Sequence, residues 1–244
     1  MTSAPSPTID SARVRALVVE AVARSADLID TPATAEQWAQ PSALEGMTVG
    51  ALCAHLVRAA GATIAYLDRT PPDRRPDADL LTAVTYFHAA VDSPVHEQIK
   101  DVSAAESAIG HQATVDKCRQ LVADLEARLA DEPVDRLVAA LGGRLLTLDD
   151  FCRTRLIEVL LHLDDLAVST GQTRPNTDPL GPAIIIEICI DIARGLNGDW
   201  GVLYALTRAE RSGDTALATA ECPPKAAPLL GVRRHRGIRG EPPG

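Results

Sequence analysis

Glu158 and His162 are four residues apart in the sequence RLIEVLLHLDD, which begins at Arg155. On an α-helix this spacing stacks a carboxylate and an imidazole one turn apart, so a single helix can supply two ligands to a metal ion. Phe151, Arg155 and Asp165 fall with this pair within a sector of roughly 80°. The same spacing is typical of a weak ion pair on a protein surface, so spacing alone leaves both interpretations open.

A metal site inside a helical bundle needs at least a third ligand from a facing helix. His55, in the segment ALCAHLVRAAGATIAYL, is the best candidate. Ala59 and Ala62 share its helical face and would leave space above the imidazole, as an open coordination position requires. A histidine between Leu52 and Leu56 is equally typical of a core position with a satisfied ring. The remaining histidines have weaker contexts: His88, His96, His111 and His235.

Amphipathic segments separated by stretches containing Pro or Gly must position these side chains. Thr48 is placed as a helix N-cap, and Ser103 with Glu106 forms a capping-box pattern that would open one long helix. Thr147 begins another helix, which Gly171 closes. The predicted helices span residues 8–30, 48–67, 81–91, 103–130, 148–169 and 180–208.

Four long amphipathic helices with moderate connections predict an all-α fold, a four-helix bundle with an additional C-terminal helix. In that last helix, the isoleucines of residues 184–192 alternate as in a strand, but Glu187 and Asp191 are four apart as on a helix. The neighbouring Leu, Ala and Arg residues favour the helix. With only two Phe, two Trp and three Tyr, the core must consist of aliphatic side chains. Glycine-rich nucleotide-binding motifs and the serine-hydrolase elbow are absent from the sequence.

The charge distribution divides the chain in two. The 244 residues include 24 basic and 33 acidic side chains, for a formal charge of −9. Residues 222–244 carry +4, so the remainder carries −13, which argues against nucleic acid or a membrane as a partner and leaves a small-molecule substrate. We therefore expect one helical domain over residues 8–210 and a disordered basic tail over 211–244.

The five cysteines are widely spaced and form no C-x-x-C motif, which indicates reduced thiols in a cytoplasmic protein. Cys53 and Cys152 lie off the proposed ligand faces and are interpreted as packed, non-catalytic thiols. The N-terminus lacks the pattern of a secretion signal. The longest apolar run, residues 183–193, is interrupted by Glu187 and Asp191, so no membrane span is predicted.

Two motifs together resemble a known family. The chain contains W-x-x-P from Trp38, followed by GMTVGALCAHL and, about a hundred residues later, RLIEVLLHLDDL. These motifs are similar to those of the metal-binding domain of mycothiol-dependent maleylpyruvate isomerase, in the DinB-like four-helix-bundle superfamily. The resemblance covers roughly residues 8–171. It implies that His55, Glu158 and His162 bind a divalent metal, usually zinc, while Arg155 and Asp165 support these ligands.

The resemblance also implies a function in which the metal activates a low-molecular-weight thiol, with mycothiol as cosubstrate of a transferase or isomerase. The sequence departs from the family at Met47, where an aromatic residue is common, and the family's second α/β domain is not expected after residue 210. Two alternatives therefore stay open: a hydrolase that uses metal-bound hydroxide, and a non-catalytic stress or interaction bundle. The apolar stretch 184–192 also leaves a symmetric homodimer open.

Overall fold

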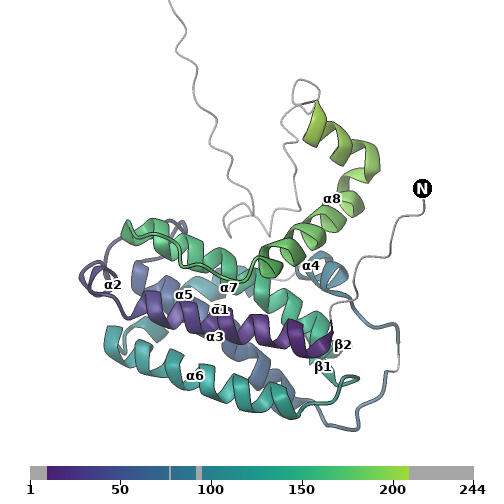
Figure 1. Cartoon of the computed structure of the whole chain (residues 1–244), viewed down its shortest axis with the longest axis horizontal. Coiled ribbons are helices and arrows are strands. Elements are labelled where there is room, and N and C mark those ends of the chain that lie inside the picture. Colours follow the sequence, from purple (N-terminus) through teal and green to yellow (C-terminus); the bar gives the residue numbers. More distant parts are fainter. Residues whose placement is uncertain (1–9, 77, 92–94, 209–244) are drawn as a thin grey trace, which may run out of the picture.

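The computed structural model describes residues 10–76, 78–91 and 95–208, which form a mostly helical protein (Figure 1). Eight α-helices and one small β-hairpin make up this part of the chain. The elements are α1 (Ser11–Ile29), α2 (Pro32–Glu36), α3 (Val49–Arg69), α4 (Ala83–Val91), α5 (Val95–Ser107), α6 (His111–Asp131), β1 (Leu137–Ala140), β2 (Arg144–Thr147), α7 (Leu148–Thr170) and α8 (Leu180–Thr207).

Four long helices form the bundle. Helices α1 and α3 each pack against both α6 and α7, so the four enclose one core (Figure 1). Its largest fully buried side chains are almost all aliphatic, among them Ile29, Leu52, Leu56 and Leu163, with Phe151 as the one aromatic residue in this set. The all-α, DinB-like bundle with an additional C-terminal helix is confirmed, and its aliphatic core fits the scarcity of aromatic residues.

Local capping explains where these helices begin and end. The Thr48 side chain accepts a hydrogen bond from the Ala51 amide at the start of α3. Thr147 does the same for Asp150 at the start of α7, and Gly171 ends that helix in the left-handed region, with φ of 65°. The N-cap and C-cap predictions at these sites are confirmed, because each depends only on residues within one turn.

The single helix predicted over residues 103–130 is wrong. The structure has two helices, α5 and α6, which are separated at Gly110, where φ is 89°. Ser103 is buried inside α5 instead of capping a helix, so the Ser103–Glu106 pattern was misleading. A residue with positive φ cannot continue a right-handed helix, and only glycine adopts such a φ without strain.

Two small elements were not predicted from the sequence. Helix α2 lies within the expected loop 31–46, and an antiparallel hairpin, β1–β2, precedes α7. The hairpin buries Val138 and Leu146 completely against the end of the bundle. It closes at Gly142 and Gly143, whose φ values of 75° and 94° favour glycine.

The C-terminal helix α8 packs against α4 and α7 and is interrupted at Gly198, where φ is 69°. The helical interpretation of residues 180–208 is thus confirmed over the strand pattern of its isoleucines. The predicted basic tail, residues 211–244, lies outside the described residues, and the domain boundary at 210 stays a prediction.

Helix α3 is the one described helix that is long and apolar enough to cross a membrane by length and composition alone. From the sequence, residues 183–193 are the longest apolar run, and no membrane span was predicted there. Two thirds of the apolar stretch of α3 is buried inside the protein, where this helix contacts α5, α6 and α7. Its apolar composition is therefore that of the central helix of a bundle.

Candidate metal centre

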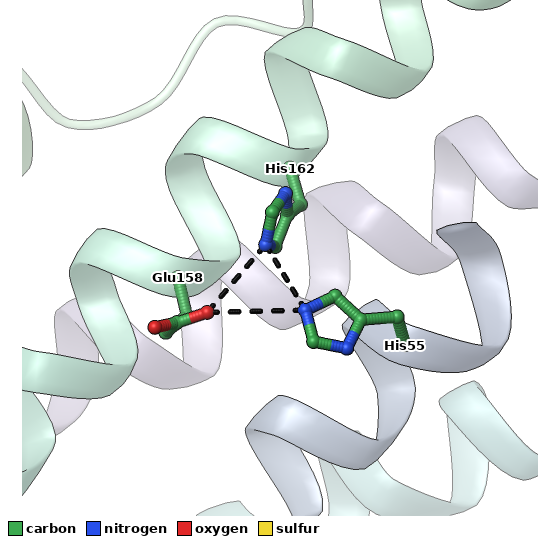
Figure 2. Close-up of side chains that lie close together, drawn as sticks. All are labelled: His55, Glu158 and His162. Carbon is green, nitrogen blue, oxygen red and sulfur yellow. Dashed lines mark hydrogen bonds and ion pairs between the residues drawn. The ribbon is translucent and has the colours of Figure 1, made fainter. Parts of the chain in front are cut away.

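Helices α3 and α7 lie side by side and bring the three predicted ligands together (Figure 2). His55 projects from α3 toward Glu158 and His162, which lie one turn apart on α7. The Nε2 atoms of the two histidines are 3.1 Å apart. The Glu158 Oε2 atom is 3.5 Å from Nε2 of His162 and 3.9 Å from Nε2 of His55. One nitrogen or oxygen donor of each residue thus faces the same point.

These separations suit a shared cation. Two ligands that bind zinc at its usual bond length with tetrahedral angles are about 3.3 Å from each other. The three observed separations, 3.1, 3.5 and 3.9 Å, bracket that value. Two imidazoles and one carboxylate also form the kind of donor set that holds zinc while leaving one position open. The residues present therefore fit a divalent ion.

Asp165 fixes the orientation of one ligand ring. Its Oδ2 atom is 3.0 Å from Nδ1 of His162. Because an ionised carboxylate can only accept, Nδ1 must carry the hydrogen, which directs Nε2 toward His55 and Glu158. Burial lowers the pKa of His162, but the hydrogen bonds to Asp165 and Glu158 outweigh burial and raise it to about 9. Without a metal, this ring therefore holds a proton between two carboxylates.

The pKa values of the other two candidate ligands, His55 and Glu158, are lowered. Burial, followed by the neighbouring His162, lowers the pKa of His55 to about 3, so this ring is neutral. Burial raises the pKa of Glu158, but its hydrogen bond with His162 and the charge of Arg155 outweigh burial and lower it to about 2. A neutral imidazole and an ionised carboxylate are the forms that bind metals.

Arg58, on α3, contacts the back of His55 and is itself held by two residues of α5, which was not predicted from the sequence. The Nη2 atom of Arg58 lies 3.0 Å from Nδ1 of His55 and 3.3 Å from the Ser103 hydroxyl. The Nε atom of Arg58 forms an ion pair of 3.4 Å with Glu106. A guanidinium only donates, so Nδ1 of His55 must accept, and the hydrogen of this neutral ring sits on Nε2. The signal in the sequence was that Arg58 follows His55 by three residues, on the same helical face.

Arg155, which the family resemblance implies as a supporting residue, makes its own contacts beside the ligands. It lies over the Phe151 ring at 4.9 Å and donates to the Tyr86 hydroxyl and the Ala59 carbonyl, both at 3.4 Å. Its influence on Glu158 is electrostatic, through the lowered pKa of that carboxylate. Arg155 and Tyr86 are both buried and contact each other.

Other candidate residues take no part in this cluster. Cys53 and Cys152 are buried free thiols, and burial raises the pKa of both, to about 12 in the case of Cys152. The Nε2 atom of His111 lies 2.7 Å from the Ile29 carbonyl, and His88 lies close to Gly195 on α8. The His96 side chain and His235 lie outside what the structure describes.

The comparison with family models shows the family of this chain. The model of the mycothiol maleylpyruvate isomerase N-terminal domain matches residues 18–167. The chain belongs to this family. The match covers more than half of the chain. It includes His55, Glu158 and His162, whose donor atoms face one another in this mycothiol maleylpyruvate isomerase domain. No curated protein and no solved structure matches the chain.

Proposed function

We propose that this protein binds one divalent ion, most suitably zinc, through His55, Glu158 and His162, and uses it with a low-molecular-weight thiol in a transferase or isomerase reaction. The observation that carries the proposal is the convergence of one donor atom from each of these residues within 4.8 Å of the others. Membership of a mycothiol-related family supports the thiol as the second component.

The metal would supply Lewis acidity, which lowers the pKa of a thiol or water molecule that it binds. The chain's own residues prepare the site for that ion. Asp165 orients His162 and keeps its Nε2 atom directed at the centre. The hydrogen bond with His162 and the buried charge of Arg155 lower the pKa of Glu158 and favour its ionised form, the form that binds a metal.

The chain's own thiols favour an external thiol as the nucleophile. Cys53, Cys118 and Cys152 are buried, and burial raises the pKa of each. Cys189 is half-buried, and burial raises its pKa as well. The thiolate is the reactive form, so none of the described cysteines is prepared for nucleophilic attack. A reaction at sulfur would therefore need a thiol brought in from solution.

A metal-dependent hydrolase is the second candidate, because two histidines and one glutamate also hold zinc in hydrolytic enzymes, where the open position takes water. This alternative uses the same three ligands and needs no thiol. The two functions therefore differ in what occupies the open position and not in the site itself.

Titration of mycothiol into zinc-loaded protein, followed by calorimetry, tests the proposal. We expect binding to the loaded wild type and at least a tenfold loss in metal-free protein and in Glu158→Gln. The variant Glu187→Gln, on α8, is the matched control and should bind normally. Zinc-loaded protein that hydrolyses esters without thiol and does not bind mycothiol would contradict the thiol function and favour the hydrolase. Protein that takes up no zinc would contradict both.

A further inference from the structure

Arg58 lies between the candidate ligand His55 and helix α5. Its Nη2 atom is 3.0 Å from Nδ1 of His55 and 3.3 Å from the hydroxyl oxygen of Ser103, on α5. Its Nε atom is 3.4 Å from Oε2 of Glu106, which also lies on α5. One guanidinium therefore contacts both a candidate metal ligand and a carboxylate of the neighbouring helix.

The contact between Arg58 and His55 has a fixed polarity. A guanidinium has donors only, so Nδ1 of His55 accepts this hydrogen bond in the metal-free protein. The other ring nitrogen, Nε2, faces Glu158 and His162, while Nδ1 points away from them (Figure 2). A neutral ring that binds a metal through Nε2 carries its hydrogen on Nδ1. Nδ1 and Nη2 are then both donors, so their contact at 3.0 Å is no longer favourable.

The charge of the ion acts in the same direction. A divalent ion at the candidate centre and the Arg58 guanidinium would contact opposite edges of the His55 ring. Like charges at such short range repel each other, and they do so more strongly where water is partly excluded. Both the hydrogen bonding and the charge therefore favour the departure of Arg58 from Nδ1 when the site is loaded.

Glu106 is the carboxylate that the structure places beside Arg58. The two residues form an ion pair between Nε and Oε2, but this pair, at 3.4 Å, is not a hydrogen bond. By contrast, Arg15 and Asp149 are hydrogen-bonded at 3.0 Å. The Arg58 and Glu106 side chains are exposed by 32% and 31%, so both have room to rotate. A guanidinium released from His55 can therefore close on Glu106 with two hydrogen bonds, the favoured geometry of such pairs.

We propose that zinc binding at His55 transfers Arg58 from the His55 ring to Glu106, which makes Glu106 a positioning residue for the loaded site. The proposal rests on the metal site of the proposed function and not on its thiol. Glu106 does not touch the ion and acts by holding Arg58 away from Nδ1. The transfer recovers only part of what Arg58 loses at His55, so Arg58 as a whole still opposes zinc binding.

Zinc affinity, measured by competition with a chelator in a cycle of single and double variants, tests the proposal. Glu106→Gln leaves Arg58 a neutral amide in place of the carboxylate, and we expect affinity to fall by about tenfold. In the Arg58→Met background there is no guanidinium to hold, so Glu106→Gln should change affinity by less than about twofold. If Glu106 acted through its charge alone, the loss in that background would be as large or larger, because Arg58 would no longer offset the carboxylate.

Asp101→Asn is the matched control, since it removes the same charge from an exposed position of α5. It should leave zinc affinity unchanged within about twofold, and circular dichroism should show equal helix content in all variants. An equal loss from Glu106→Gln in both backgrounds, or no loss in either, would overturn the transfer while leaving the metal site in place. Wild-type protein that takes up no zinc would overturn the transfer and the proposed function together.

Discussion

Buried arginines at two places in this protein differ in how fully their donors are used. At the hairpin end of the bundle, Arg15 donates to Asp149 at 3.0 Å and also to three backbone carbonyls at the end of α6 and just beyond it. Arg136 pairs with Glu132 at 2.9 Å and donates to three carbonyls at the end of α3 and just beyond it. Both guanidiniums have a carboxylate and satisfy helix ends that would otherwise lack donors.

Around His55 and His162, the donors of the nearby arginines are used less fully. Arg155 has no carboxylate within ion-pair distance among the described residues, and its hydrogen bonds are 3.2 to 3.4 Å long. Nearby, Arg58 pairs with Glu106 at 3.4 Å, between Nε and Oε2. This pair is longer than the pairs of Arg15 with Asp149, at 3.0 Å, and of Arg136 with Glu132, at 2.9 Å. The hairpin end serves stability, and the centre between α3 and α7 keeps its capacity for a ligand.

The largest expected effect is on stability at the hairpin end. Replacing Arg136 by Met takes away one of the two arginine partners of Glu132, with Arg128 remaining at 2.8 Å, and leaves three backbone carbonyls without their donor. We expect the free energy of unfolding in urea to fall by about 3–5 kcal/mol, with unchanged zinc affinity of the folded protein. The control Arg119→Met, at an exposed pair with Asp30, should cost under about 1 kcal/mol. A loss at Arg136 no larger than this control would contradict the comparison.

The next effect concerns metal affinity. Asp165→Asn removes the carboxylate that orients His162, and we expect zinc affinity to fall by about 10- to 100-fold in competition with a chelator. The unfolding free energy of the metal-free protein should change far less than in Arg136→Met. Asp164→Asn is the matched control, since the Asp164 side chain is half-exposed, at 49%, and pairs only weakly with Arg174 at 3.5 Å. Equal zinc affinity in the two asparagine variants would show that Asp165 does not support metal binding.

The pH dependence of metal binding has a definite sign. The pKa of His162 is raised from 6.5 to about 9, so zinc must displace a proton from this ring below about pH 9. Apparent affinity should therefore rise with pH between about 6.5 and 9, by up to tenfold per unit. The protonated ring stabilises the metal-free protein below pH 6.5, and this contribution is lost as pH rises through about 9. Calorimetric titrations that show no dependence on pH would contradict the proton competition.

The smallest expected effect is an increase in zinc affinity, whereas Asp165→Asn lowers it. Arg58 donates to Nδ1 of His55, which leaves the ring hydrogen on Nε2, the atom that faces the centre. A metal at Nε2 requires that hydrogen to move, so the Arg58 contact must be released. Arg58→Met should therefore tighten zinc binding, by up to about tenfold, or 1.4 kcal/mol. Weaker zinc binding in this variant would show that Arg58 supports the loaded site.

The parts of the fold that the sequence predicted well are those governed by neighbouring residues. The caps at Thr48 and Thr147 and the helical pair Glu158–His162 depend on spacings of three and four residues. His55 could be assigned by combining its helical face with the family motif. The division into α5 and α6 was missed because the capping-box pattern at Ser103 outweighed Gly110, and only tertiary packing shows that Ser103 is buried.

The surroundings of the site were harder to predict because they bring distant segments together. Arg58 meets Glu106 across 48 residues of sequence, and Arg155 meets Tyr86 across 69. Neither pair follows from helical periodicity, since each depends on how α4 and α5 pack against the bundle. The hairpin was missed for a related reason: its strands are short, and burial against the bundle end stabilises them more than their own propensity.

Metal content measured by elemental analysis tests the central claim most directly. Wild-type protein incubated with zinc and freed of excess should retain one ion per chain, and the double variant His55→Ala, His162→Ala should retain none. The variant His88→Ala, His111→Ala removes two histidines away from the centre and should retain the full complement. Zinc-free wild type, or equal zinc in wild type and the His55, His162 double variant, would contradict the account.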